Sequence, residues 1–179
     1  RLKERLHELE HQVRDMLIFA RGELPLPDRI APGALFEALR AAAEPHVQGM
    51  QVRWQCDSRE GELLCNRDTL VGSLLNLIEN AIQAAGREAR LKVHLYSRGQ
   101  ALRLCISDDG PGIDRATLAR LGEPFFTTKT TGTGLGLAVV KAVARAHQGD
   151  VQLRSRPGRG TCAILTLPLL GATHPLIQE

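Results

Sequence analysis

Three amide side chains in one apolar stretch are the first residues whose types and spacing favour chemistry. Asn76, Asn80 and Gln83 lie within "NRDTLVGSLLNLIENAIQAA", residues 66–85, four and then three positions apart. In an α-helix, side chains at these spacings share one face. Amide oxygens suit a Mg²⁺ ion whose other ligands are water and phosphate oxygens. The spacing therefore predicts a face that holds a magnesium–phosphate group, with solvated or capping amides as the alternative.

A carboxylate followed by two glycines is the second candidate. It stands in "ISDDGPGI", residues 106–113, where Asp108 closes an apolar run and Gly110 and Gly112 follow. A carboxylate can accept a hydrogen bond from an adenine amino group, and glycines let the backbone approach a purine edge. An ordinary turn built from Asp, Gly and Pro is the alternative.

The third candidate is a loop rich in Gly and Thr, "GEPFFTTKTTGTGLGL", residues 122–137. Its glycines run directly into an apolar, helix-periodic segment, and backbone N–H groups at a helix start bind phosphate. Threonine hydroxyls and one lysine add donors and charge, and the paired Phe125 and Phe126 are suited to anchor a lid. The P-loop pattern, in which lysine directly follows a glycine, is missing. A flexible surface loop is the alternative.

The segments around these residues predict a two-layer α/β (α+β) sandwich. Helical periodicity is expected over 34–43, 66–85 and the segment after Gly136, with a short helix near 115–121. Apolar and polar residues alternate at 50–56, which predicts a strand, and in four later segments that are expected to form two hairpins. The first hairpin joins 90–97 to 101–108, and the second joins 150–155 to 162–169. One mixed, largely antiparallel sheet covered by helices on one face follows from this order.

The beginning of the chain predicts a separate coiled-coil helix. Apolar residues recur there with heptad spacing, at Leu2, Leu6, Leu9, Val13, Met16 and Ala20. We therefore divide the chain into a helix over 1–22, a proline-rich linker over 23–33, a compact domain over 34–169 and a flexible tail over 170–179. An N-terminal helix packed on the same domain is the alternative.

Composition excludes several classes of protein. The 179 residues are 43% hydrophobic, 24% charged and 3% aromatic, with a net charge of +3. This charge is too small to indicate nucleic-acid binding, and no basic cluster with interleaved aromatics occurs. No apolar run approaches the length of a membrane span. The four cysteines lack metal-ligand spacing and predict reduced thiols.

In this order and spacing, the three candidates resemble the nucleotide-binding boxes of sensor histidine kinases, within the gyrase–Hsp90–histidine kinase–MutL superfamily. The motifs are N-L-x-x-N-A from Asn76, D-x-G-x-G from Asp108 and G-T-G-L-G-L from Gly132, and the resemblance covers about Pro32 to Leu169. "EPFFTTK" followed by "GTGLGLAVV" is most similar to nitrogen-regulator-type kinases that serve σ54-dependent regulators, among them flagellar-regulatory sensor kinases. The resemblance implies the Bergerat-type ATPase fold and protein-histidine kinase activity.

The resemblance also implies ATP and Mg²⁺ as cofactors and a role for each matching residue. Asn80 takes the position of the magnesium ligand, Asn76 faces the phosphates, and Asp108 binds the adenine amino group; Lys129 joins the two amides as a catalytic residue. The implied ATP-binding residues are Asn76, Asn80, Gln83, Ala84, Asp108, Gly110, Gly112, Ile113, Phe126, Thr127, Thr128, Lys129, Gly132, Thr133, Gly134, Leu135, Gly136, Leu137 and Thr161.

Departures from the family pattern bear on the reaction. Gln83 stands where many members carry a basic residue, and Asp109 replaces the commoner Asn, which we interpret as a tolerated turn residue. Hydrolytic relatives carry a glutamate at the position of Asn76, and an amide cannot act as a general base. Glu79 points about 100° around the helix from Asn80. The sequence therefore favours phosphoryl transfer; a non-catalytic ATP-sensing module or an ATPase of the superfamily is the alternative.

The expected partners follow from the resemblance as well. Residues 1–21 resemble the end of a second dimerisation helix, which places the acceptor histidine upstream of Arg1; His11, in "HQVRDM", is the alternative within the chain. We expect a homodimer through this helix, transfer to the dimerisation domain of the same kinase, and a cognate response regulator. The domain is expected in the cytoplasm, and attachment of the intact protein to a membrane stays open. His147 is expected to act as a helix C-cap.

Overall fold

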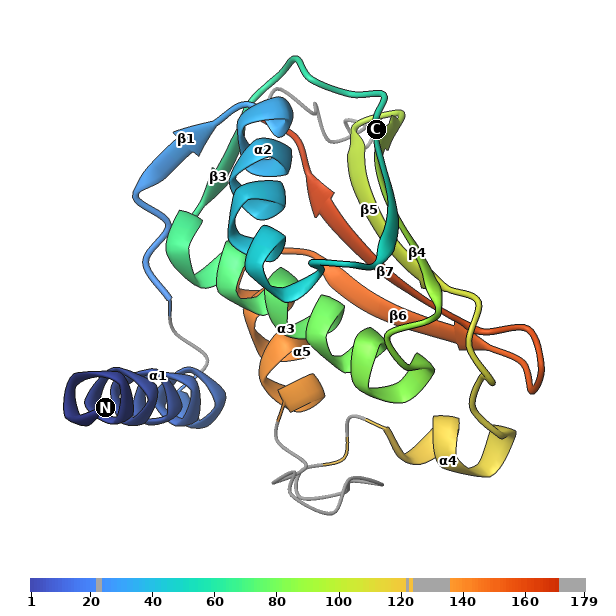
Figure 1. Cartoon of the computed structure of the whole chain (residues 1–179). Helices are drawn as coiled ribbons and strands as arrows, with labels where there is room; N and C mark the ends of the chain where they lie inside the picture. Colours follow the sequence, from blue (N-terminus) through green and yellow to red (C-terminus); the bar gives the residue numbers. More distant parts are fainter. Residues whose placement is uncertain (22–23, 122, 124–135, 171–179) are drawn as a thin grey trace.

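A twisted sheet with helices on one face is the main feature of the fold in the computed structural model, which describes residues 1–21, 24–121, 123 and 136–170 (Figure 1). The predicted two-layer sandwich is confirmed. The elements in chain order are α1 (Leu2–Arg21), β1 (Asp28–Ile30), α2 (Pro32–Ala43), the 3₁₀ turn η1 (Glu44–His46), β2 (Gln51–Cys56), β3 (Leu63–Cys65), α3 (Arg67–Ala85), β4 (Arg90–Arg98), β5 (Ala101–Asp108), α4 (Arg115–Arg120), α5 (Gly136–Ala146), β6 (Asp150–Ser155) and β7 (Thr161–Pro168).

The main sheet is mixed and mostly antiparallel, as expected. Its five strands lie in the order β2-β4-β5-β7-β6. Only β2 and β4 run parallel; the predicted hairpins β4–β5 and β6–β7 are antiparallel, and β5 pairs with β7. Because β5 and β7 are adjacent, the segment after β5 lies beside the turn of the second hairpin.

One hydrophobic core joins the helices to the inner face of the sheet. Burial alternates along β4 and β5, so that every second side chain points toward the helices. Most of the fully buried side chains come from α2, α3 and the central strands, among them Leu35, Phe36, Leu39, Leu70, Leu74, Ile78, Val93, Leu95, Leu102 and Ile106. The four cysteines are free thiols, as predicted.

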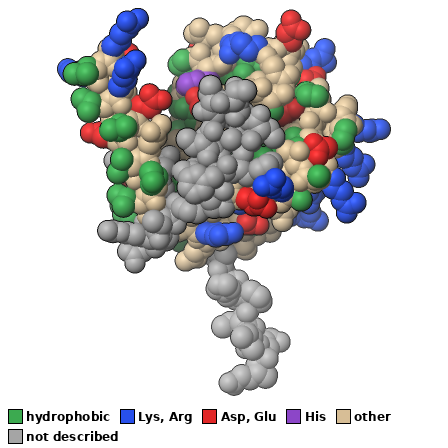
Figure 2. Space-filling model, turned by 90° about the horizontal axis from the view of Figure 1, so that it is seen from below, with side chains coloured by type: hydrophobic (Ala, Val, Ile, Leu, Met, Phe, Trp, Pro, Cys, Tyr) green, Lys and Arg blue, Asp and Glu red, His purple; other side chains and the backbone are tan. Residues whose placement is uncertain are grey.

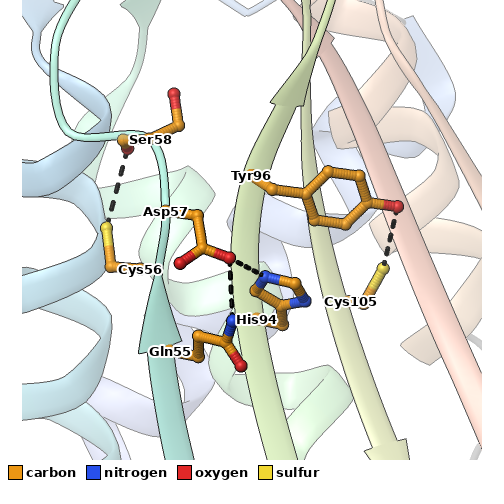
Figure 3. Close-up of polar contacts among 7 residues, drawn as sticks. All are labelled: Gln55, Cys56, Asp57, Ser58, His94, Tyr96 and Cys105. Atoms are coloured by element: carbon orange, nitrogen blue, oxygen red, sulfur yellow. Dashed lines mark hydrogen bonds and ion pairs between the residues drawn. The ribbon is translucent and has the colours of Figure 1, made fainter.

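The opposite face of the sheet is polar and carries its own contacts (Figure 3). His94 Nε2 lies 2.6 Å from Asp57 Oδ2, and Gln55 donates to the same oxygen at 2.8 Å. The bond to His94 lowers the pKa of Asp57. Farther along, Cys105 Sγ lies 3.8 Å from the Tyr96 hydroxyl. None of the described residues expected to bind nucleotide lies on this face, so the chemistry belongs to the helix side.

Part of the expected linker is ordered against the domain. Asp28–Ile30 forms β1, which pairs antiparallel with β3, a strand that the sequence pattern did not reveal. The Asp28 carboxylate accepts a hydrogen bond from the backbone N of Arg67 at 2.9 Å, at the start of α3. The prolines flank this strand instead of interrupting it, so all three residues of β1 keep their N–H groups.

The N-terminal helix α1 presents its apolar seam to solvent. Leu2, Leu6, Leu9, Val13 and Met16 are each at least half exposed, and Figure 2 shows hydrophobic side chains along this helix. α1 contacts α5 on the helical side of the domain. No helix among the described residues is both long and apolar enough to cross a membrane.

Candidate active site

Helix α3 carries the amide residues along the edge of the core. It begins at the N-cap Asn66, whose side chain accepts a hydrogen bond from Thr69 N at 3.3 Å. Its apolar face is buried, whereas Asn76 and Asn80 are partly exposed and Gln83 and Ala84 are exposed. The predicted polar face on one side of the helix is therefore present.

The start of α5 lies directly beside these amides. A Cβ placed on Gly136, the first residue of α5, would lie 3.5 Å from Asn76 Nδ2 and 3.9 Å from Asn80 Nδ2. The structure thus brings together two of the three candidate motifs, which are more than fifty residues apart in sequence. Backbone N–H groups at a helix start and neutral amide side chains form a combination suited to phosphate oxygens.

Asp108, at the end of β5, lies half-buried at the far end of α3. Its Oδ1 accepts hydrogen bonds from Gly110 N at 2.9 Å and from Thr161 N at 3.3 Å. Burial raises the pKa of Asp108, and these two bonds oppose the shift. Among the described residues, the hydrogen bonds that Asp108 accepts fall on Oδ1, so Oδ2 keeps its capacity to accept from a ligand.

Glycines around Asp108 are required by close backbone contacts. A Cβ on Gly110 would lie 2.5 Å from Ala85 Cβ, which fixes the turn against the end of α3. Gly112 and Gly160 both have φ of +75°, and a Cβ on Gly160 would lie 1.9 Å from the Asp108 carbonyl oxygen. The turn after β5 and the turn of the second hairpin are therefore packed backbone to backbone.

Ser155 joins these two turns and was not predicted from the sequence. Its Oγ accepts from Ile113 N at 2.7 Å, donates to the Gly160 carbonyl at 2.9 Å and lies 2.8 Å from Thr161 Oγ1. Because Ser155 has a single proton, the Thr161 hydroxyl is the donor in the last contact when that proton goes to Gly160. The predicted second hairpin was the only indication of this role in the sequence, because its strands pair Ser155 with Thr161.

The Gly160→Ala substitution should destabilise the domain. The left-handed conformation costs about 1–2 kcal/mol for a residue with a Cβ, and the contact with Asp108 adds about 1–3 kcal/mol of overpacking. Gly158→Ala is the matched control, because Gly158 has the same φ of +75° but nothing within 4 Å of a Cβ. We expect the melting temperature to fall by several degrees more for Gly160→Ala than for Gly158→Ala. Equal shifts would contradict the close approach.

Glu79 is turned away from the candidate site. Its carboxylate lies 3.0 Å from Nδ1 of His46, in η1 on the other side of α3. This contact agrees with the expectation that Glu79 does not face the same side as Asn80. Asp109, expected as a mere turn residue, has a structural role: its Oδ1 accepts from Arg90 N at 2.7 Å, at the start of β4.

Residues 122 and 124–135 of the predicted loop lie outside the described residues. Among them are the candidate residues Phe125, Phe126, Thr127, Thr128, Lys129, Gly132, Thr133, Gly134 and Leu135. Leu137, the last residue of the loop, is partly buried against the core. Described residues of the three motifs thus lie along α3, with Gly136 beside Asn76 and Gly110 beside Ala85.

The chain is similar to known proteins of one family. Residues 65–171 match the family described as histidine kinase-, DNA gyrase B- and HSP90-like ATPases. The chain is 81% identical to the sensor protein kinase FleS of Pseudomonas aeruginosa, covering all of this chain and 45% of FleS. It is 31% identical to the signal transduction histidine-protein kinase AtoS of Escherichia coli, over 94% of this chain and 28% of AtoS. The chain spans less than half the length of these relatives.

Solved structures are similar as well. Full-length ShkA, solved in complex with AMPPNP, matches with a TM-score of 0.76 and 27% identity, over 94% of this chain and 37% of that one. The catalytic domain of the histidine kinase ThkA, in a nucleotide-free form, matches with a TM-score of 0.70 and 25% identity, over 79% of this chain and 94% of that one.

Proposed function

Because the chain belongs to the family of histidine kinase-, DNA gyrase B- and HSP90-like ATPases, we propose that it holds Mg·ATP along α3 and transfers the γ-phosphoryl group to a histidine of the dimerisation domain. The chain is the ATP-binding catalytic domain of a sensor histidine kinase. The observation that carries the proposal is the placement of Gly136 beside Asn76 and Asn80, with Asp108 at the far end of the same helix.

Asp108 is proposed to recognise adenine. Two backbone N–H groups hold its Oδ1, which orients the carboxylate and leaves Oδ2 to accept from the exocyclic amino group. Gly110, Gly112, Ile113 and Thr161 shape this end of the site through the backbone contacts of the two turns. Gln83 and Ala84 are exposed on the last turns of α3, and we propose that they line the nucleotide site at this end.

The amide pair suits a magnesium ion that shares its shell with phosphates. When bound, Mg²⁺ would neutralise charge on the β- and γ-phosphate oxygens. Asn80 is proposed as its protein ligand, and Asn76 and the backbone N–H groups at the start of α5 as donors to the phosphates. Neutral amides add no negative charge beside the phosphates, which fits this donor set. The loop residues Phe126, Thr127, Thr128, Lys129, Gly132, Thr133, Gly134 and Leu135, with Leu137, are proposed to belong to the ATP-binding site.

Transfer is favoured over hydrolysis by the residues around Asn80. The position one turn before it is the amide Asn76, which cannot take a proton from water, and the Glu79 carboxylate is held by His46. Catalysis then consists of positioning the γ-phosphoryl group and neutralising its charge, while the nucleophile comes from another domain. A non-catalytic ATP-sensing module is the competing function.

Phosphorylation of a separate acceptor fragment tests the proposal. The chain is incubated with γ-labelled Mg·ATP and a fragment of the intact kinase that carries the dimerisation helices. Acid-labile, alkali-stable label on the fragment is expected, and it should be absent when the acceptor histidine is replaced by glutamine. Tight nucleotide binding without any transfer would instead favour the ATP-sensing module.

The remaining assignments concern the intact protein. We propose the division into a dimerisation helix over 1–22, a connection over 23–33, a catalytic domain over 34–169 and a tail over 170–179. The partners proposed are a second copy of the kinase, the acceptor domain of that kinase, and a response regulator of the σ54-dependent kind. We also propose that the domain lies in the cytoplasm, where ATP and the regulator are available.

Self-association through α1 is a further expected result. Three heptads with an exposed apolar seam form only a marginal coiled coil, so a weak monomer–dimer equilibrium should appear in sedimentation at high concentration. Leu6→Asp and Val13→Asp should each abolish it, whereas Gln12→Asp, off the seam, should not. A dimer that survives both seam substitutions would show that α1 is not the contact.

A further inference from the structure

His147 lies buried where α5 ends and connects α5 to α3. Its side chain is 3% exposed. Ring atom Nδ1 lies 2.7 Å from the Val143 carbonyl oxygen, and Nε2 lies 3.0 Å from the backbone N of Asn66. Because a backbone amide only donates, Nε2 is unprotonated and Nδ1 carries the proton. The bond to Val143 confirms the predicted C-cap role, but the bond to Asn66 goes beyond it.

The neutral form of this ring is the one that the fold favours. Burial lowers the pKa of His147, and the Val143 carbonyl opposes that shift only in part. A protonated ring would turn a second N–H toward the N–H of Asn66, which cannot accept it. The connection between the two helices therefore depends on Nε2 acting as an acceptor.

The two helices run antiparallel and meet again at the nucleotide site. Asn66 lies ten residues before Asn76 along α3, a rise of about 15 Å, and Gly136 lies eleven residues before His147 along α5, a rise of about 16 Å. At one end of the two helices, the backbone N of Asn66 donates a hydrogen bond to His147 Nε2. At the other end, Gly136 lies beside Asn76 and Asn80. A bond at the first end therefore restrains sliding at the second.

We propose that His147 is a positioning residue of the nucleotide site. The hydrogen bond that its Nε2 accepts from Asn66 fixes the axial register of α5 on α3, and with it the distance between the start of α5 and the amides of Asn76 and Asn80. This inference rests on the proposed function, since it concerns the phosphate end of that site. Asp108, on β5, is held by separate contacts and does not depend on His147.

Two pairs of variants separate positioning from mere stability. In His147→Gln the amide oxygen can still accept from Asn66 N, whereas in His147→Asn the shorter side chain reaches only the Val143 carbonyl. Asn66→Pro removes the N–H that His147 accepts, and Asn66→Ala removes the cap side chain but keeps that N–H. Asn66 follows a strand, so the residue before it suits a proline, but its own φ of −97° must rotate by about 30° to reach the roughly −65° that proline prefers.

Calorimetric titration of the 179-residue chain with Mg·ATP and with adenosine provides the readout. We expect His147→Asn and Asn66→Pro to weaken Mg·ATP binding about tenfold, the size of one hydrogen bond, and to leave adenosine binding unchanged. His147→Gln and Asn66→Ala should stay within about twofold of the parent for both ligands, although their melting temperatures fall.

Three outcomes overturn the inference while leaving the proposed function standing, provided that the parent chain binds Mg·ATP. The first is parental Mg·ATP affinity in both His147→Asn and Asn66→Pro. The second is a loss of adenosine and Mg·ATP affinity together, in proportion to the loss of stability. The third is a Gln variant as weak as the Asn variant. If His147→Asn does not fold, the comparison of Asn66→Pro with Asn66→Ala decides alone. A parent chain that fails to bind Mg·ATP would instead refute the proposed function.

Discussion

The Asn80→Ala substitution should remove the magnesium-dependent part of nucleotide affinity. As the proposed metal ligand, the Asn80 amide oxygen would hold Mg²⁺, and the bound ion would neutralise charge on the phosphates. The variant in the presence of Mg²⁺ should bind ATP as the parent does in EDTA, because the contacts of Asp108 at the other end of α3 are untouched. Phosphorylation of an acceptor fragment should fall on the order of 100-fold or more, since the charge of the transferred group is no longer neutralised. Calorimetric titration with and without Mg²⁺ measures the first effect.

The neighbouring residue supplies the control for this experiment. Glu79→Gln changes the position next to Asn80, but its side chain faces His46 on the other side of α3. In Glu79→Gln, Mg²⁺ should raise the affinity for ATP by the same factor as in the parent. If Mg²⁺ strengthens binding to Asn80→Ala by the parental factor, the metal has another ligand and the assignment fails.

The Asp108→Asn substitution should weaken ATP binding without harming the fold. The amide oxygen can still accept from Gly110 and Thr161, but the amide nitrogen then faces the adenine amino group with a donor. Loss of a charge-assisted hydrogen bond together with this mismatch costs about 2–4 kcal/mol, or about 30- to 1,000-fold in affinity. Unchanged affinity for ATP in the variant would mean that adenine is bound elsewhere.

The same substitution should preserve or raise thermal stability at neutral pH. Burial raises the pKa of Asp108 above its ordinary value of 3.8, so the folded state binds its proton more tightly than the unfolded state does. The ionised carboxylate therefore lowers stability above the folded pKa, and this cost disappears as the pH falls below 3.8. Melting temperatures of parent and variant, compared from pH 7 to pH 3.5, should converge at the acid end. A variant that is less stable at pH 7 would contradict the burial of an unfavourable charge.

Local sequence patterns predicted most of the secondary structure and the polar groups of the candidate site. The spacing of Asn76 and Asn80 placed them on one side of a helix, and the alternation of 90–97 and 101–108 gave the first hairpin. Each of these features depends on residues that lie close together in the sequence, within one or two helical turns or within one hairpin. The spacing of the apolar residues is therefore enough to predict them.

Contacts between residues distant in sequence were accessible only from the tertiary structure. Local patterns along the chain were enough to predict the three motifs, the helices and hairpins that carry them, and the order of these elements. The folded chain decided that Asp28–Ile30 is a strand paired with β3, that Ser155 joins two turns, and that Gly160 contacts Asp108. It also decided that His147 bonds to Asn66, 81 positions away. Each of these contacts depends on how whole elements pack together, and a hydrogen bond across such a distance leaves no periodic trace in either of the segments that it joins.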